Sequence, residues 1–221
     1  MISKQLITTS MPPLKAAETG TDALYHMDEY RVSFLPVLDG QLYLGLLSES
    51  EIFKLTDPDH PLSEQKVQYR LVYVNEDQHI FDVIRIMSSE KIPLLPVLDE
   101  NKFYLGIITL NKLIEQLGNF TSMNSPGAIL ILELNQNDYV LSQIAQIVES
   151  QDIKILSLFV SSDIDSTKME ITLKLNKFEI QSLIKALNRY DYIIKATYTE
   201  DEKMIDDMAE RYNALMNYLN I

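Results

Sequence analysis

Apolar and polar positions in the second quarter of the chain predict a helix, two strands and a shorter helix. Four apolar residues follow the i, i+3, i+4, i+7 spacing of an amphipathic helix: Ile80, Val83, Ile84 and Met87. Asn75 and Gln78 suit the N-terminus of this helix. Apolar runs at 94–98 and 103–108 flank a polar stretch, which indicates two strands joined by a turn. A short helix is expected after Thr109.

The first half of the chain repeats itself at an offset of 60 residues, which becomes 61 after a one-residue insertion in a turn. Leu-Pro-Val-Leu-Asp at 35–39 recurs at 95–99, and Tyr-Leu-Gly-Leu-Leu-Ser at 43–48 corresponds to Tyr-Leu-Gly-Ile-Ile-Thr at 104–109. Each copy is expected to form a strand, a helix, two strands and a helix. Because one copy is too small to close a core alone, we expect the two copies to pack face to face.

These repeats resemble the CBS-domain family, in which an apolar-Pro-Val strand and a turn precede Gly-apolar-apolar-Ser/Thr-x-x-Asp at the start of a helix. The resemblance covers residues 1–118, with repeats at about 1–60 and 61–118. It implies a disc-like Bateman module with clefts between the repeats. Many such clefts bind AMP, ATP, S-adenosylmethionine or related adenosyl ligands, so an adenine nucleotide is the expected effector and no resident cofactor is expected.

Two positions in each repeat correspond to the family motif. Ser48 and Glu51 occupy its Ser/Thr and Asp positions in the first repeat, and glutamate keeps the charge. In the second repeat Thr109 keeps the hydroxyl, but Lys112 replaces the acid and cannot accept a hydrogen bond. Loss of a charged hydrogen bond worth about 1.5 to 3 kcal/mol weakens a site roughly tenfold to a hundredfold. One conventional site is therefore expected, around Ser48 and Glu51.

Basic residues near these motifs are candidates for contacts with phosphate. Arg31 and Lys91 stand at equivalent places before the two proline-containing strands. The charge of Lys112 would make the cleft of the second repeat favour a more anionic ligand. The alternative is that all three are solvated surface charges and that the pair of repeats is degenerate.

A second domain is expected after a linker at 119–127, where Asn, Ser, Pro and Gly are closely spaced. Apolar patterns predict its strands and helices over 128–200 in the order strand, helix, strand, strand, helix, strand: 128–134, 141–148, 154–161, 169–175, 180–187 and 193–199. This βαββαβ order places two helices on one face of a four-stranded antiparallel sheet. The whole chain is thus expected to be an α+β protein.

The βαββαβ order is similar to that of ferredoxin-like, ACT-type regulatory domains, which bind amino acids near their first strand-to-helix loop. That loop usually supplies a glycine, and residues 135–139 contain none. Amino-acid binding near Asn137 and Asp138 is therefore one hypothesis, and a purely dimerising domain is the other.

Residues 201–221 predict a C-terminal amphipathic helix. Thr199 and Glu202 have the spacing of a capping box. Five apolar residues then follow one another at alternating steps of three and four, which is the a/d spacing of a short coiled coil: Ile205, Met208, Tyr212, Leu215 and Leu219. This helix would either pack on its own chain or contribute to a homodimer.

Composition narrows the classes of function. A net charge of −13 and a pI near 4.6 argue against a nucleic-acid partner, which needs a basic surface. The chain contains no cysteine, so disulfides, thiol nucleophiles and cysteine-based metal sites are excluded. Neither a signal peptide nor an apolar run of membrane-spanning length is present, so we expect a cytoplasmic protein without membrane contact.

Catalytic and metal-binding motifs are also missing from the sequence. His26, His60 and His79 share no metal-ligand spacing. There is no glycine-rich phosphate loop, no Gly-x-Ser-x-Gly and no His-Glu-x-x-His. We therefore expect neither an enzyme nor a metal site.

The favoured interpretation is a non-catalytic sensor, in which an adenosyl ligand in the repeat cleft changes the contacts presented to a partner enzyme. A CBS pair followed by an ACT-like domain resembles acetoin-utilisation (AcuB-like) regulatory proteins. The competing hypothesis is a constitutive homodimeric assembly protein whose ligand sites are degenerate; Lys112 favours it, whereas Ser48 with Glu51 favours the sensor.

Overall fold

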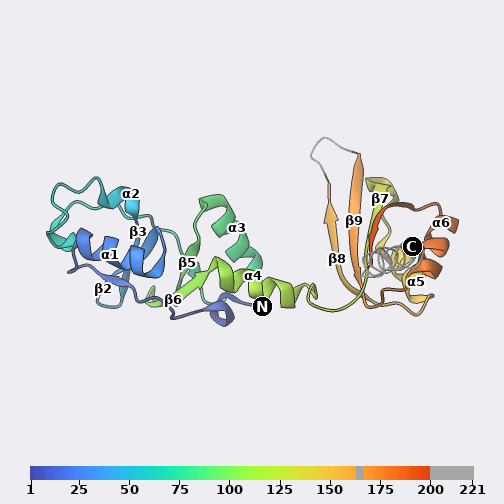
Figure 1. Cartoon of the computed structure of the whole chain (residues 1–221), viewed down its shortest axis with the longest axis horizontal. Coiled ribbons are helices and arrows are strands. Elements are labelled where there is room, and N and C mark those ends of the chain that lie inside the picture. Colours follow the sequence, from blue (N-terminus) through green and yellow to red (C-terminus); the bar gives the residue numbers. More distant parts are fainter. Residues whose placement is uncertain (163–166, 200–221) are drawn as a thin grey trace, which may run out of the picture. The chain divides into compact units, whose positions relative to one another are not determined.

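The chain has two units, Met1–Leu117 and Gly118–Ile221, and a large hydrophobic core organises the described residues of each. The computed structural model (Figure 1) describes residues 1–162 and 167–199. The sequence also predicts a turn at 163–166, between the expected strands at 154–161 and 169–175. This turn and the predicted helix at 201–221 lie outside the described residues.

The N-terminal unit contains two copies of the same arrangement. The first copy consists of β1 (Leu14–Lys15), α1 (Gly20–Tyr30), β2 (Phe34–Asp39), β3 (Leu42–Ser48) and α2 (Glu49–Ile52). The second consists of β4 (Val74–Asn75), α3 (Ile80–Glu90), β5 (Leu94–Leu98), β6 (Tyr104–Thr109) and α4 (Leu110–Phe120). In each copy the first strand pairs in parallel with the second, which pairs antiparallel with the third. The predicted order is confirmed in both copies.

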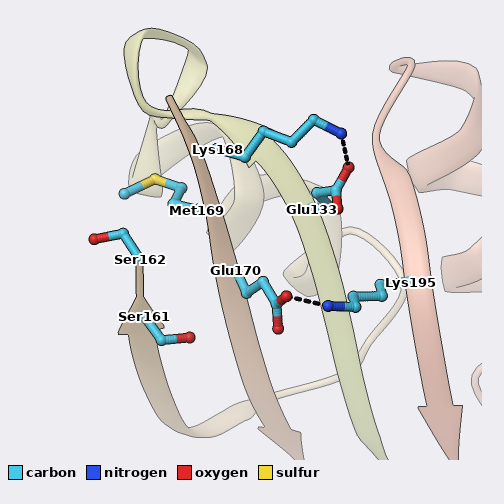
Figure 2. Close-up of a pocket in the computed structure, with 7 residues that line it drawn as sticks. All are labelled: Glu133, Ser161, Ser162, Lys168, Met169, Glu170 and Lys195. Carbon is cyan, nitrogen blue, oxygen red and sulfur yellow. Dashed lines mark hydrogen bonds and ion pairs between the residues drawn. The ribbon is translucent and has the colours of Figure 1, made fainter. Parts of the chain in front are cut away.

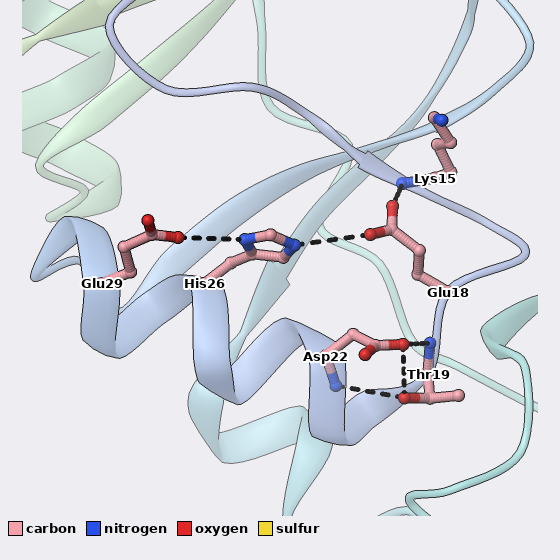
Figure 3. Close-up of polar contacts among 6 residues, drawn as sticks. All are labelled: Lys15, Glu18, Thr19, Asp22, His26 and Glu29. Atoms are coloured by element: carbon pink, nitrogen blue, oxygen red, sulfur yellow. Dashed lines mark hydrogen bonds and ion pairs between the residues drawn. The ribbon is translucent and has the colours of Figure 1, made fainter.

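Local side-chain hydrogen bonds fix where α1 and α3 begin. At α1, Thr19 and Asp22 form a capping box in which each side chain accepts the other's backbone N–H, at 3.1 and 3.0 Å (Figure 3). The Asp22 carboxylate accepts from the Thr19 backbone N–H and also from the Thr19 hydroxyl, at 2.8 Å, and these two bonds hold the pKa of the Asp22 carboxyl below its usual value. The assignment of Asn75 and Gln78 to the start of α3 was wrong, because His79 is the N-cap and its Nδ1 accepts from the N–H of Phe81.

The two copies are tied together by the segments that precede them. Thr8, ahead of the first copy, exchanges backbone hydrogen bonds of 2.8 and 3.3 Å with Ile107 on β6. Arg70, ahead of the second copy, exchanges two bonds of 2.9 Å with Leu46 on β3. One continuous core includes buried residues of both copies, which confirms that they pack together.

Glycines at equivalent positions permit these crossings. Gly45 and Gly106 have φ values of +144° and +150°, which side chains rarely adopt. A Cβ atom would lie 2.6 Å from Tyr69 Cβ at position 45 and 2.5 Å from Ile7 Cγ2 at position 106. The crossing segments therefore approach β3 and β6 closely only because these positions carry no side chain.

The C-terminal unit is a four-stranded sheet with helices on one face (Figure 1). Its elements are β7 (Ile129–Asn135), the 3-10 turn η3 (Gln136–Asp138), α5 (Leu141–Glu149), β8 (Ile155–Ser161), β9 (Lys168–Leu175), α6 (Gln181–Arg189) and β10 (Ile193–Tyr198). The strand order is β10-β7-β9-β8 and every pair is antiparallel. The predicted βαββαβ order is confirmed, and α4 extends to Phe120, into the predicted linker.

Candidate functional site

A cavity of about 460 Å³ opens between the two copies of the N-terminal unit. Its walls come from the end of α1, from β5, and from β6 with the start of α4: Tyr30, Arg31, Leu94, Ile107, Thr109 and Asn111 are among them. Of the predicted site residues, this cavity brings together Arg31 and Thr109. We refer to it as the Thr109 cleft.

The hydroxyl of Thr109 marks the polar end of this cleft. Thr109 precedes α4, and its Oγ1 accepts the backbone N–H of Lys112 at 3.3 Å. A hydroxyl that accepts this bond still has one proton to donate. Because α4 is an 11-residue helix, its N-terminal end also presents the positive side of the helix dipole to the cleft. This end of the cleft is suited to an anionic group.

Arg31 supplies a cation from the other copy. It ends α1 in a left-handed conformation with φ 53° and ψ 49°, and its N–H donates to the carbonyls of Met27 and Asp28. Lys91 ends α3 in almost the same conformation, with φ 53° and ψ 46°. The left-handed cap fixes the direction in which each side chain leaves its helix, and of the two only Arg31 is among the residues lining the Thr109 cleft.

Tyr30 forms an aromatic wall that sequence reasoning missed. Its ring stacks against His26, with centroids 6.3 Å apart and planes inclined by 23°. His26 lies between two carboxylates, with Nε2 3.4 Å from Glu18 Oε1 and Nδ1 3.6 Å from Glu29 Oε2 (Figure 3). The aromatic wall is thus positioned by a polar cluster on α1 and the loop before it. A comparison of the two repeats would have singled out Tyr30, because its counterpart is Glu90.

The equivalent place in the first copy is arranged differently, because Arg70 spans it. Arg70 Nη2 lies 2.7 Å from Glu90 Oε2 and donates to the Glu90 carbonyl at 3.2 Å. The guanidinium lies 5.7 Å from the centroid of the Phe34 ring, and the backbone of Arg70 pairs with Leu46. These three partners correspond by the repeat offset to three walls of the Thr109 cleft: Tyr30, Leu94 and Ile107.

Three of the remaining predicted site residues have partners in or next to their own helices, and the fourth, Lys91, is exposed. Ser48 caps α2 by accepting the N–H of Glu51 at 3.3 Å, and its Oγ lies 2.9 Å from Ser50 Oγ. The Glu51 carboxylate pairs with Lys54. Lys112 Nζ lies 3.1 Å from Glu115 Oε1. Ligand contacts by Ser48, Glu51, Lys91 and Lys112 stay predictions.

A second, shallower cavity of about 390 Å³ lies on the sheet of the C-terminal unit (Figure 2). Lys168 Nζ lies 2.5 Å from Glu133 Oε1, and Lys195 pairs with Glu170. The hydrogen bond from Lys168 holds the pKa of the Glu133 carboxyl below its usual value. Each carboxylate is thus neutralised by a lysine, so these four side chains leave no net charge to attract an ionic ligand.

The predicted amino-acid loop of the C-terminal unit is the short turn η3 after β7. Asn135 Nδ2 donates to Asp138 Oδ2 at 2.9 Å across this turn. Amino-acid binding near Asn137 and Asp138 stays a prediction.

Within residues 1–162 and 167–199, no three His, Asp or Glu side chains are arranged to hold a metal ion. Among the same residues, no helix has the length and apolar character needed to cross a membrane.

A known family matches the N-terminal unit. Residues 3–57 and 67–119 match the CBS domain family. The CBS domain-containing protein YhcV of Bacillus subtilis is 27% identical over 140 residues, which cover 61% of this chain and 96% of YhcV. Two further curated relatives are matched over only 38% and 59% of their own lengths.

Solved structures resemble somewhat more than half of the chain. A CBS domain pair/ACT domain protein from Thermotoga maritima is 24% identical with a TM-score of 0.49, covering 54% of this chain and 98% of that one. A protein assigned to acetoin utilization (AcuB) from Vibrio cholerae is 20% identical with a TM-score of 0.48, covering 56% of this chain and 95% of that one.

Proposed function

We propose that this chain, whose N-terminal unit is a pair of CBS domains, is a non-catalytic regulatory protein that binds an adenosyl ligand in the Thr109 cleft. CBS-domain pairs commonly bind adenosyl ligands, and they are generally regulatory rather than catalytic. The matches to two inosine-5'-monophosphate dehydrogenases cover only 22% and 18% of those enzymes and fall on their CBS part. Those matches therefore lend no catalytic role to this chain.

The observation that carries the proposal is the convergence of an arginine, a hydroxyl and apolar walls on one cavity. Arg31 and the Thr109 hydroxyl suit the phosphate of a nucleotide, at the positive end of α4. Tyr30 offers a ring on which adenine can stack. The cavity volume of about 460 Å³ falls within the range of roughly 300 to 1,000 Å³ typical of small-molecule sites.

The ribose needs an acceptor that the second repeat does not provide at its motif position. Lys112 stands there, and its ammonium group can only donate. Asn111 lines the cavity one residue earlier, and its side-chain carbonyl is an acceptor. We assign the ribose hydroxyls to Asn111. Because its amide is neutral, we expect weaker binding than a site with the family's acid would give, by roughly tenfold to a hundredfold.

Regulation follows from the origin of the cavity walls. Arg31 belongs to the first copy, whereas Thr109 and Asn111 belong to the second. A ligand held by both would favour the arrangement in which the two copies have this spacing. The ligand can shift the equilibrium between the two arrangements by no more than the difference between its binding free energies for them. In the proposal, a partner enzyme or a second copy of the chain responds to this shift. The proposal thereby keeps the expectation from the sequence that the full chain is an AcuB-like regulator with an ACT-like domain.

The second candidate function is a constitutive homodimeric assembly protein without a ligand. Lys112 favours it, because the acid of the motif is missing from the copy that has the open cleft. This hypothesis predicts that no adenosyl compound stabilises the protein.

Thermal unfolding of the full chain with AMP, ADP, ATP, S-adenosylmethionine, NAD and cyclic dinucleotides at millimolar concentration separates the two functions. Ligand at a hundred times its dissociation constant adds about 2.7 kcal/mol, which raises the melting temperature by several degrees. No shift with any compound would favour the assembly protein.

A matched pair of variants then locates the site. Arg31→Asn and Lys91→Asn each remove a cation from an equivalent left-handed position, which asparagine tolerates. The proposal predicts a smaller ligand-induced shift for Arg31→Asn and an unchanged shift for Lys91→Asn. The reverse result would place the phosphate in the equivalent cleft around Ser48, which we call the first-copy cleft.

A further inference from the structure

We infer that Arg70 closes the first-copy cleft, so that each chain holds one adenosyl ligand rather than two. The inference rests on the proposed function and adds to it the number of sites and the residue that sets this number. It starts from a difference between two equivalent positions, Thr8 and Arg70. Both lie in crossing segments, and both exchange backbone hydrogen bonds with the third strand of the opposite copy.

The side chains at these two positions differ in reach and charge. Threonine at position 8 is short, and the Thr109 cleft beside it is open, with a volume of about 460 Å³. Arginine at position 70 is long enough to cross the equivalent space. It reaches Glu90 through an ion pair of 2.7 Å and a bond of 3.2 Å to the backbone carbonyl.

Each contact of Arg70 involves a position that would form a wall of the first-copy cleft. Glu90 corresponds to Tyr30, the aromatic wall, and Phe34 corresponds to Leu94. The Arg70 guanidinium lies over the Phe34 ring at 5.7 Å, so it covers an apolar side chain at the position of a cleft wall. A nucleotide would have to displace both contacts to enter.

Glu90 also makes this cleft unfavourable for an anionic ligand. If a phosphate drew Arg70 away, the Glu90 carboxylate would lose its partner and repel the phosphate. At the Thr109 cleft the corresponding residue is Tyr30, which carries no such charge. The two copies therefore differ in electrostatics as well as in available space.

The closure can be removed without leaving a buried charge. The side chains of Arg70 and Glu90 are 38% and 41% exposed, so both can be replaced without leaving a partner charge away from water. The double variant Arg70→Thr/Glu90→Tyr copies the residues found at the equivalent positions 8 and 30, and it leaves no Glu90 carboxylate to repel a phosphate. Arg85→Thr is the matched control, because Arg85 lies on the same helix as Glu90 and forms an exposed ion pair with Asp82 at 3.1 Å.

The test is calorimetric titration of the full chain with AMP, read as the number of sites per chain. We expect one site in the wild type, two in the double variant Arg70→Thr/Glu90→Tyr and one in Arg85→Thr. Two sites in the wild type, or one in a folded Arg70→Thr/Glu90→Tyr, would overturn the inference while leaving the proposed function intact. AMP binding by none of the three proteins would overturn the proposed function itself, and this inference with it.

A second variant keeps the test decisive if circular dichroism shows that Arg70→Thr/Glu90→Tyr does not fold. Glu90→Ala leaves residue 70 unchanged, and it removes the ion pair that anchors the guanidinium across the cleft. A second AMP site in Glu90→Ala supports closure by Arg70. A single site in this folded variant contradicts it.

Discussion

Arg31 and Lys91 adopt the same left-handed backbone conformation, with φ of 53° in both, at the equivalent ends of α1 and α3. Residues other than glycine pay a conformational cost in this region, because Cβ lies too close to the following carbonyl. The repeat thus preserves an unfavourable conformation and a positive charge at both positions. In the proposed function, only Arg31 uses its charge on a ligand.

The first prediction concerns the cost of this conformation. Lys91→Gly is expected to stabilise the protein by up to about 1 kcal/mol, because glycine adopts positive φ without the clash. Denaturant unfolding followed by circular dichroism measures this change. A loss of stability would mean that the Lys91 side chain makes a favourable contact that outweighs the backbone strain.

The second prediction tests the crossing segments. Gly45→Ala is expected to destabilise the N-terminal unit by about 2 to 4 kcal/mol, because the new Cβ would lie 2.6 Å from Tyr69 Cβ and 3.1 Å from the Arg70 carbonyl oxygen. Gly40→Ala is the control: it also has positive φ, but no atom lies within 4 Å of the added carbon, so it should cost only about 1 to 2 kcal/mol. Equal losses in the two variants would show that the close approach is unimportant.

The third prediction concerns alkaline pH. Burial raises the pKa of the Tyr43 hydroxyl, with a smaller contribution from Tyr104, and burial also raises the pKa of Tyr104. An unfolded tyrosine ionises near pH 10, while Tyr43 stays protonated in the folded protein. The stability contributed by this difference is complete below pH 10 and is lost as the pH rises above it. Above pH 10, each such tyrosine lowers the free energy of unfolding by about 1.4 kcal/mol per pH unit.

Tyr43→Phe separates this effect from other groups that titrate at high pH. The variant loses the hydrogen bond from the Tyr43 hydroxyl to the Val72 carbonyl, 2.8 Å long, and should be less stable by about 1 kcal/mol at neutral pH. Above pH 10 its free energy of unfolding should fall less steeply than that of the wild type. Parallel pH profiles would contradict the assignment.

Much of the fold was predictable because its signals are local. The spacing of Ile80, Val83 and Met87 is set by the helix repeat, and all three are buried. The misplaced start of α3 has a local cause as well. Gln78 Oε1 accepts the N–H of Asn75 at 2.7 Å, which is the same i, i+3 bond that a capping box uses. In this chain that bond closes a turn after β4 rather than starting a helix.

The candidate site was only partly predictable because its differences are non-local. Arg31 and Thr109 followed from the repeat and the family motif. The motif favoured the first copy, since Ser48 and Glu51 are present there. The contacts of Arg70 with Phe34 and Glu90 join residues 36 and 20 positions away from it (70 − 34 and 90 − 70). Short-range periodicity contains no information about such contacts.

The most direct test of the account is the affinity for AMP of two variants that make the same local change. Ser48→Ala and Thr109→Ala each remove the side-chain cap of a helix, α2 or α4, but only Thr109 lines the open cleft. Calorimetry should show a loss of about tenfold or more for Thr109→Ala, because a hydrogen bond to a charged phosphate is removed, and no change for Ser48→Ala. A loss confined to Ser48→Ala would place the ligand in the first-copy cleft and contradict the account.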